Sequence, residues 1–229
     1  MIETAVILAA GRARRLGGQV PKGLLSIGGE PLLVRLCRQL LDRGLEVVVV
    51  TGHRAEEIEA VVARSGVRFV RNPIYAESEL GWSCGVGLAE VAGQGALVVL
   101  GDNVTDGALF DRVLESGGEL TLAWLDVALD EESMKLQVEG DRPVLMGKGL
   151  PLTATGEFAG VLAARGRGLT ALREAIARFD PRMDLCHGPL NSLLEGPLDC
   201  RAVDCSGMRW IEIDFPHDVT RMRRIFDLE

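Results

Sequence analysis

A short basic segment near the amino end carries residue types suited to binding a polyanion. An apolar run that begins at Ala5 turns into glycine and arginine at Gly11. Glycine lets the backbone pass close to a ligand, and the N–H groups of such a turn converge on an anion. The cations of the segment are Arg12, Arg14, Arg15 and Lys22. The segment predicts a cradle for a triphosphate, and a solvated basic loop after a first strand is the alternative.

Two known phosphate-loop patterns do not describe this segment. A GxGxxG fingerprint would need a glycine where Ala13 stands, and a GxxxxGK[ST] sequence is absent from the chain. The sequence therefore predicts neither a dinucleotide-binding fingerprint nor a P-loop.

Acidic residues far from this segment could hold a divalent cation beside it. Asp102 follows an apolar run, and a carboxylate at the carboxyl end of a parallel strand lies where Mg²⁺ on a nucleotide would sit. Near the carboxyl end, Glu212 and Asp214 share one face of a short strand, so one of them can point into the site. Asp102 could instead cap the following helix, and Asp214 could occupy the N-terminus of the last helix.

A glycine-rich segment, 72–87, could hold a nucleobase. Gly81, Ser83 and Gly85 would let backbone and hydroxyl groups hydrogen-bond the polar edge of a flat ligand. We expect a loop here, followed by a short helix at about 88–91. The alternative is a glycine-rich helix start with Ser83 as its cap.

Lysine is rare in this chain. Lysine and arginine together number 25, but the only lysines are Lys22, Lys135 and Lys148. Because a compact ammonium and a planar guanidinium bind differently, each lysine is a candidate for a position where the difference matters.

Composition narrows the class of protein. The formal net charge of -8 leaves no basic face for a nucleic acid. The five cysteines show no metal-binding spacing, and the three histidines have no partner spacing that indicates a metal site or a triad. The chain starts without the charge order of a signal peptide, and no run approaches ~20 apolar residues. We expect a cytoplasmic protein without a membrane partner.

Hydrophobic patterning predicts the elements that would position these residues. Strands at 46–51, 67–70 and 95–100 alternate with helices from Pro31 to Gly44 and at 54–65, which is the order of a parallel sheet with ligands at its carboxyl edge. After residue 119 the pattern changes to a mixed insertion. Its expected strands are 120–125, 135–138, 143–146, 158–163 and 202–204, and its expected helices are 168–179, 189–194 and one from about 216.

Three motifs in order resemble one family. Leu8 to Leu16 followed by Pro21-Lys22 resembles the LAAGxGxRL...PK signature of nucleotidyltransferases that act on sugar phosphates and phospho-alcohols. GDNV at 101–104 is similar to the metal-binding strand end of that family, and WIEID at 210–214 to its second metal-binding segment. The stretches 134–151 and 156–163 most resemble the bacterial phosphocholine and inositol-1-phosphate cytidylyltransferases.

The resemblance implies a fold and a role for each matched residue. The fold is a single-domain α/β, Rossmann-like three-layer sandwich over 1–229 with a mostly parallel mixed sheet, its nucleotide-binding half at 1–118 and its acceptor-binding half at 119–229. Arg15 and Lys22 would contact phosphates, and Asp102 with Asp214 would bind Mg²⁺. The implied nucleotide-binding residues are Leu8, Ala9, Ala10, Gly11, Arg12, Ala13, Arg14, Gly81 and Ser83. The expected acceptor-binding residues are Lys148, Glu157 and Trp210.

The sequence departs from the family pattern at one point of the loop. Ala13 replaces a glycine, and Arg14 stands where small hydroxylated residues are usual. This departure concerns the path of the loop and its grip on the phosphates.

The implied activity is Mg²⁺-dependent transfer of a nucleoside monophosphate, CMP from CTP, to a small phosphorylated alcohol or phosphonate, with release of pyrophosphate. The partners would be these small molecules, with a homodimer as an option. A molybdenum-cofactor nucleotidyltransferase is the alternative within enzymes, suggested by LAAGRARRLGG and the KGLL after it. A nucleotide-sensing module without turnover is the alternative outside them.

Overall fold

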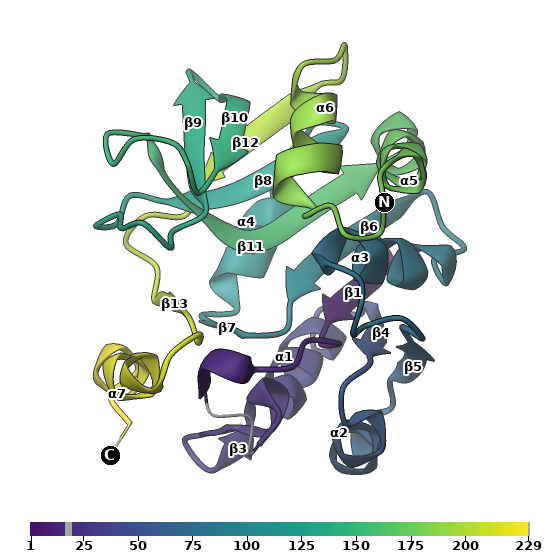
Figure 1. Ribbon diagram of the computed structural model, residues 1–229, viewed down its shortest axis with the longest axis vertical. Coiled ribbons are helices and arrows are strands. Elements are labelled where there is room, and N and C mark those ends of the chain that lie inside the picture. Colours follow the sequence, from purple (N-terminus) through teal and green to yellow (C-terminus); the bar gives the residue numbers. More distant parts are fainter. Residues whose placement is uncertain (17–19, 229) are drawn as a thin grey trace.

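The first strand, β1 (Thr4–Leu8), lies inside a nine-stranded sheet because both of its faces are apolar (Figure 1). This computed structural model describes residues 1–16 and 20–228. β1 pairs in parallel with β4 (Glu46–Thr51) and with β6 (Gly95–Leu100), whose predicted bounds are confirmed. β5 (Arg68–Arg71) lies in parallel beyond β4, one residue later than the prediction.

The second part of the chain extends the same sheet. β11 (Gly156–Arg165) pairs antiparallel with β6 and with β8 (Leu120–Leu125), so the two parts share one sheet. The predicted α/β fold with a mixed sheet is confirmed. The remaining strands of the sheet are β9 (Lys135–Glu139), β10 (Arg142–Gly147) and β12 (Cys200–Asp204).

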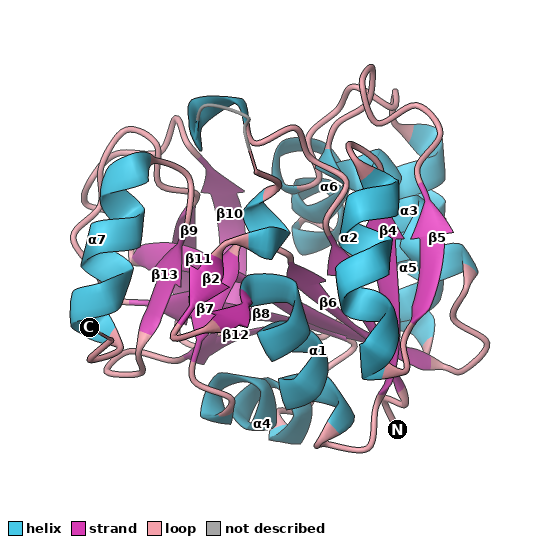
Figure 2. Ribbon diagram, turned by 90° about the horizontal axis from the view of Figure 1, so that it is seen from below, coloured by secondary structure: helices cyan, strands magenta, loops and turns pink. Residues whose placement is uncertain are grey.

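Helices cover both faces of the sheet and build two cores (Figure 2). Ala5 and Ile7 of β1 face one core, whereas Val6 and Leu8 face the other, as expected from the alternation of side chains along a strand. The first core receives α1 (Leu32–Leu41), α2 (Ala55–Val62), α4 (Ala108–Glu115) and α7 (Pro216–Ile225). The second receives α3 (Leu80–Ala89), α5 (Arg167–Arg178) and α6 (Asn191–Leu194).

The prediction of a loop at 72–87 followed by a helix at 88–91 is right for residues 72–79 and wrong beyond them, and the alternative of Ser83 as the helix cap is wrong because the N-cap is Glu79. The structure has α3 over Leu80–Ala89, so Gly81, Ser83 and Gly85 lie inside a helix. Glycine is a poor helix former, but here it allows close packing on the sheet. A Cβ on Gly87 would lie 2.3 Å from Cγ1 of Val6. Packing therefore overrides local propensity in this segment.

The other helix predictions need small corrections. The helix expected at 54–65 is α2 followed by a 3₁₀ turn, Ala63–Ser65. The helix expected at 189–194 is preceded by a π-helical turn, Cys186–Leu190, which contains Pro189. Two-residue strands β2 (Ser26–Ile27) and β3 (Glu30–Pro31) form a hairpin before α1. Within the described residues, none of the helices has the length and apolar character needed to cross a bilayer.

Candidate active site

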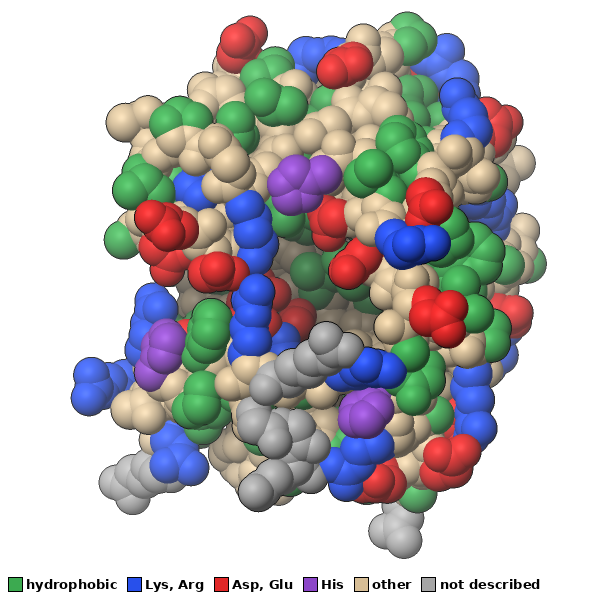
Figure 3. All heavy atoms as spheres, viewed as in Figure 1, with side chains coloured by type: hydrophobic (Ala, Val, Ile, Leu, Met, Phe, Trp, Pro, Cys, Tyr) green, Lys and Arg blue, Asp and Glu red, His purple; other side chains and the backbone are tan. Residues whose placement is uncertain are grey.

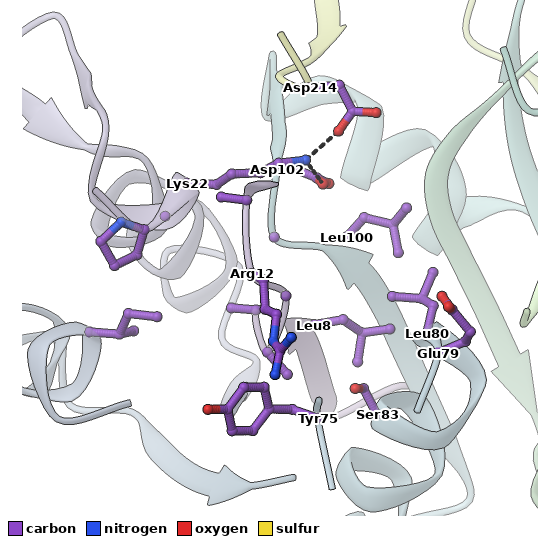
Figure 4. Close-up of a pocket in the computed structure, with 18 of the residues that line it drawn as sticks. Leu8, Arg12, Lys22, Tyr75, Glu79, Leu80, Ser83, Leu100, Asp102 and Asp214 are labelled. Atoms are coloured by element: carbon purple, nitrogen blue, oxygen red, sulfur yellow. Dashed lines mark hydrogen bonds and ion pairs between the residues drawn. The ribbon is translucent and has the colours of Figure 1, made fainter. Parts of the chain in front are cut away.

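A pocket of about 500 Å³ opens at the carboxyl ends of β1 and β6. These strands flank the point where the chain changes direction across the sheet, and ligands of open α/β sheets bind at such a point. Acidic and basic side chains gather around a hollow on this face of the molecule (Figure 3). The pocket has a charged end, with Lys22, Asp102 and Asp214, and a second end at Ser83, where Arg12 and Glu79 also lie (Figure 4).

Lys22 lies between the two aspartates at the charged end. Its Nζ donates to Oδ2 of Asp102 at 3.0 Å and also to Oδ1 of Asp214. Burial lowers the pKa of Lys22, but the two carboxylates outweigh burial and raise the pKa above its ordinary value. The ammonium is therefore held in its charged form.

A two-stranded sheet brings the acidic segments together. β7 (Asn103–Thr105) pairs antiparallel with β13 (Trp210–Glu212), and the N–H of Ile213 donates to the carbonyl oxygen of Asp102 at 3.0 Å. The carboxyl-terminal segment thus lies beside β7, although paired residues such as Ile211 and Val104 are far apart in sequence (Figure 1). Each strand has only three residues, which is why sequence patterning did not reveal β7.

The aspartate whose side chain accepts hydrogen bonds at the start of α7 is Asp218, not Asp214, and the N-cap residue is Phe215. Oδ2 of Asp218 accepts from the N–H of Asp214 at 3.0 Å and from the N–H of Phe215 at 2.7 Å. Asp218 therefore satisfies the N-terminus of α7. The carboxylate of Asp214 is left to face the pocket.

Three carboxylates at this end could hold a metal ion. Oxygens of Asp102, Glu212 and Asp214 all lie within 4.8 Å of one another. Oδ1 of Asp102 is buried and has no hydrogen-bond partner among the described residues, so it is open to a ligand. Burial and the two aspartates raise the pKa of Glu212 well above its ordinary value. Hard oxygen ligands on a half-buried acidic cluster suit a divalent cation such as Mg²⁺.

Arg15 connects this end to the rim of the pocket. Its Nη1 lies 3.2 Å from Oδ2 of Asp214 and 3.1 Å from Oε2 of Glu132. The same Oε2 lies 3.0 Å from Nζ of Lys148. Glu132 therefore holds one cation from each side of the pocket mouth, and these cations lower its pKa, Lys148 more than Arg15.

The backbone of the basic loop shows what the departure at Ala13 entails. Ala13 has φ 49°, in the left-handed region where a residue other than glycine is destabilised by about 1 kcal/mol. A glycine in the family pattern would avoid this strain. Gly11 and Arg12 line the pocket, and the guanidinium of Arg12 lies 5.7 Å from the ring centroid of Tyr75. The side chain of Arg14 and residues 17–19 lie outside the described part of the chain.

The end of the pocket at Ser83 differs in part from the predicted nucleobase site. Leu8, Ala9, Ala10 and Ser83 line the pocket as expected, but the N–H of Ala9 already donates to Val50 at 2.9 Å. Gly81 is not in the lining. A Cβ there would lie 3.1 Å from the carbonyl oxygen of Met183, so Gly81 allows close packing of α3 instead.

None of the expected acceptor residues is among the residues that line this pocket. Lys148 is at the rim beside Glu132. The indole N–H of Trp210 is committed to the carbonyl oxygen of Ala159 at 3.0 Å. Burial raises the pKa of Glu157 to about 7, although a hydrogen bond with Ser133 opposes the shift.

All three lysines lie at or next to the site. Lys135 is fully buried, and its Nζ donates to the carbonyl oxygen of Lys148 at 2.8 Å, which fixes the strand end that carries Lys148. The scarcity of lysine was thus a useful signal. The residue that sequence reasoning missed is Asn72, a buried side chain that contacts Ser83 behind the pocket wall. Its only sequence signal is a polar residue between a strand and a proline.

Comparison with known proteins gives one family and several relatives that match this chain nearly from end to end. Residues 5–175 match the family model described as "MobA-like NTP transferase domain". The bifunctional IPC transferase and DIPP synthase of Rubrobacter xylanophilus is 32% identical over 94% of this chain and 50% of its own length. The chain spans about half the length of the curated relatives that it matches from end to end.

Solved structures share the fold. The inositol-1-phosphate CTP transferase from T. maritima gives a TM-score of 0.84 at 21% identity, over 99% of this chain and 96% of its own. The CTP:phosphocholine cytidylyltransferase LicC from Streptococcus pneumoniae gives 0.76 at 19% identity, over 99% and 100%. At these identities the likeness establishes the fold.

Proposed function

The chain belongs to the MobA-like NTP transferase domain family, and from this premise we propose that it transfers CMP from CTP to a small phosphorylated alcohol or phosphonate and releases pyrophosphate. The observation that carries the proposal is the position of Lys22 between Asp102 and Asp214 at the charged end of a nucleotide-sized pocket. The choice of CTP is supported by the two enzymes of solved structure that share the fold, a CTP transferase and a CTP:phosphocholine cytidylyltransferase.

The reaction needs charge neutralisation more than proton transfer. A phosphate monoester is already an anion near neutral pH, so its oxygen can attack the α-phosphorus without a general base. One P–O bond forms to the acceptor oxygen and the bond to pyrophosphate breaks. The chain must therefore align two anions and stabilise the added charge.

Each cation has a distinct task in this proposal. Lys22 would leave its aspartates and donate to the α-phosphate, while Arg15 and the loop N–H groups would hold the departing pyrophosphate. Asp102 and Asp214 would hold Mg²⁺, with Glu212 beside them. The ion would neutralise charge on the α-phosphate and on the attacking phosphate. Lys148 would attract the acceptor at the rim.

The first alternative differs from the proposal in its acceptor, and the second differs in having no turnover. A molybdenum-cofactor nucleotidyltransferase would use the same loop, and Asp214 lies beyond the residues 5–175 that the family model matches. A sensing module would bind the triphosphate without turnover. The retention of Lys22 with both aspartates favours an enzyme.

A pyrophosphate-release screen tests the proposal. The purified chain with Mg²⁺ would be given each of the four nucleoside triphosphates with phosphocholine, 2-aminoethylphosphonate, inositol-1-phosphate or glucose-1-phosphate. We expect release with CTP and one of the phospho-alcohols or the phosphonate. Tight CTP binding with no release from any pair would favour the sensing module.

A further inference from the structure

Asn72 makes three hydrogen bonds behind the Ser83 end of the pocket. Its Nδ2 donates to Oγ of Ser78 and to Oγ of Ser83, each at 3.0 Å. Its Oδ1 accepts from the N–H of Ile74, also at 3.0 Å. Since only the oxygen can accept from an N–H, the bond to Ile74 fixes which end of the amide faces the two serines. The side chain is 1% exposed, so this orientation is not exchanged with water.

The amide determines the direction of both hydroxyl groups. A serine hydroxyl has one proton and two lone pairs, and here one lone pair of each accepts from Asn72. Neither proton has an acceptor among the described residues. Ser78 and Ser83 both line the pocket, and the hydroxyl of Ser83 is drawn facing the cavity (Figure 4). Each hydroxyl is thus left as a donor toward a ligand.

Apolar side chains flank these donors, and the carboxylate of Glu79 lies in the same part of the lining. Leu8, Leu80 and Leu100 line the pocket close to Ser83 (Figure 4). Such walls suit the faces of a flat ring and keep water away from its edge. In such surroundings an unmatched donor or acceptor is costly, so the pattern of polar atoms on the ring decides which ring binds.

We propose that Asn72 is a positioning residue that turns Ser78 and Ser83 into a pair of donors reading two adjacent acceptors, N3 and O2, on the edge of cytosine. On the Watson–Crick edge, cytosine is the one base among the four in which two neighbouring atoms both accept. Uracil has an N–H at position 3, guanine presents two donors there, and adenine pairs one acceptor with an amine. This inference rests on the proposed function and specifies how its nucleotide is selected.

The isosteric change Asn72→Asp tests the direction of the hydroxyls. An aspartate can still accept from the N–H of Ile74, but its second oxygen accepts from the serines, which then present lone pairs to the pocket. We expect the ratio of kcat/KM for CTP over UTP to fall by about tenfold or more. The ratio of dissociation constants, measured by calorimetry, should fall in the same way. A merely structural role would weaken both nucleotides equally.

Serine variants keep the test decisive if Asn72→Asp does not fold. Ser83→Ala and Ser78→Ala each remove one donor. Loss of the donor that reads N3 should lower the CTP over UTP ratio, whereas loss of the donor that reads O2, an acceptor that uracil shares, should weaken both nucleotides. Ser192→Ala is the matched control, because its hydroxyl donates to the carbonyl oxygen of Pro189 in another part of the chain. Its ratio should equal that of the wild type.

The outcomes separate this inference from the proposed function. An unchanged ratio in the folded variants, or a wild type that binds CTP and UTP equally, overturns the readout. Selective CTP binding that is lost in Asn72→Asp, together with no turnover of any acceptor, supports the readout and refutes the proposed transfer.

Discussion

Two lysines at the site have carboxylate partners but lie at different depths. The side chain of Lys22 is 20% exposed, and its partners Asp102 and Asp214 are 22% and 27% exposed. The side chain of Lys148 is 40% exposed, and its partner Glu132 is 51% exposed. Coulomb interactions strengthen as solvent is removed, whereas exposed ion pairs contribute about 0–1 kcal/mol.

The difference indicates separate tasks for two similar ion pairs. Charge moved within the deep group is felt strongly by any reacting atom there, so that group suits the chemical step. The rim group is screened by water, so it suits the capture of a charged acceptor. Substitutions at the two depths should therefore affect different kinetic constants.

The largest effect is expected at Lys22. Lys22→Met removes the cation proposed for the α-phosphate, and kcat for pyrophosphate release should fall by about 100-fold or more. Thermal unfolding checks that the variant remains folded. Turnover at the wild-type rate would refute the assignment and remove the contrast between the two depths.

The same variant should bind metal better without nucleotide. In the free protein the ammonium of Lys22 neutralises Asp102 and Asp214, so it competes with a divalent cation for their oxygens. We expect Lys22→Met to bind Mn²⁺ about tenfold more tightly than the wild type, measured by electron paramagnetic resonance. Lys148→Met is the control. Equal Mn²⁺ affinity in Lys22→Met and wild type would show that the deep carboxylates are not the metal ligands.

Glu157 extends the comparison to a half-buried carboxyl group that has no ion-pair partner within 4 Å among the described residues. Burial raises its pKa to about 7, above the value near 4.3 of an unfolded chain, so the folded state holds the proton more tightly. Stability should therefore fall as pH rises from about 4.5 to 7. Glu157→Gln should match the wild type near pH 4.5 and exceed it by about 1–3 kcal/mol at pH 8. Urea denaturation at both pH values measures this, and an equal difference at the two would contradict it.

The smallest effect is expected at the rim. Lys148→Met should raise the KM for the acceptor by roughly fivefold and leave the KM for the triphosphate and kcat nearly unchanged, because its charge is screened. Initial rates over a range of both substrates give the constants. A change confined to the triphosphate KM would assign Lys148 to the nucleotide instead.

Local patterns predicted much of this molecule. Buried strands such as Glu46–Thr51 and Gly95–Leu100 were predicted correctly because a short continuous apolar run bounded by turn residues is typical of a buried strand. Lys22, Asp102 and Asp214 were found because the motifs around them are local as well. Their mutual contact was an expectation that rested on the family resemblance.

Features that depend on long-range contacts were not predicted from the sequence. β7 is formed only because β13 pairs with it, and three residues give no periodicity to detect. α3 contains glycines that favour a loop until the sheet packs against them. The contact of Asn72 with Ser83 joins a strand end to a helix face, which no spacing rule records.

The confinement of lysine to this site has a practical consequence for labelling chemistry. An amine-directed reagent meets Lys22, Lys135 and Lys148 and the amino terminus, and Lys135 is 1% exposed. Acylation reports on the free amine, and the raised pKa of Lys22 keeps that amine scarce. Among the lysines, Lys148 should therefore react first, and acylation of that residue labels the rim of the pocket.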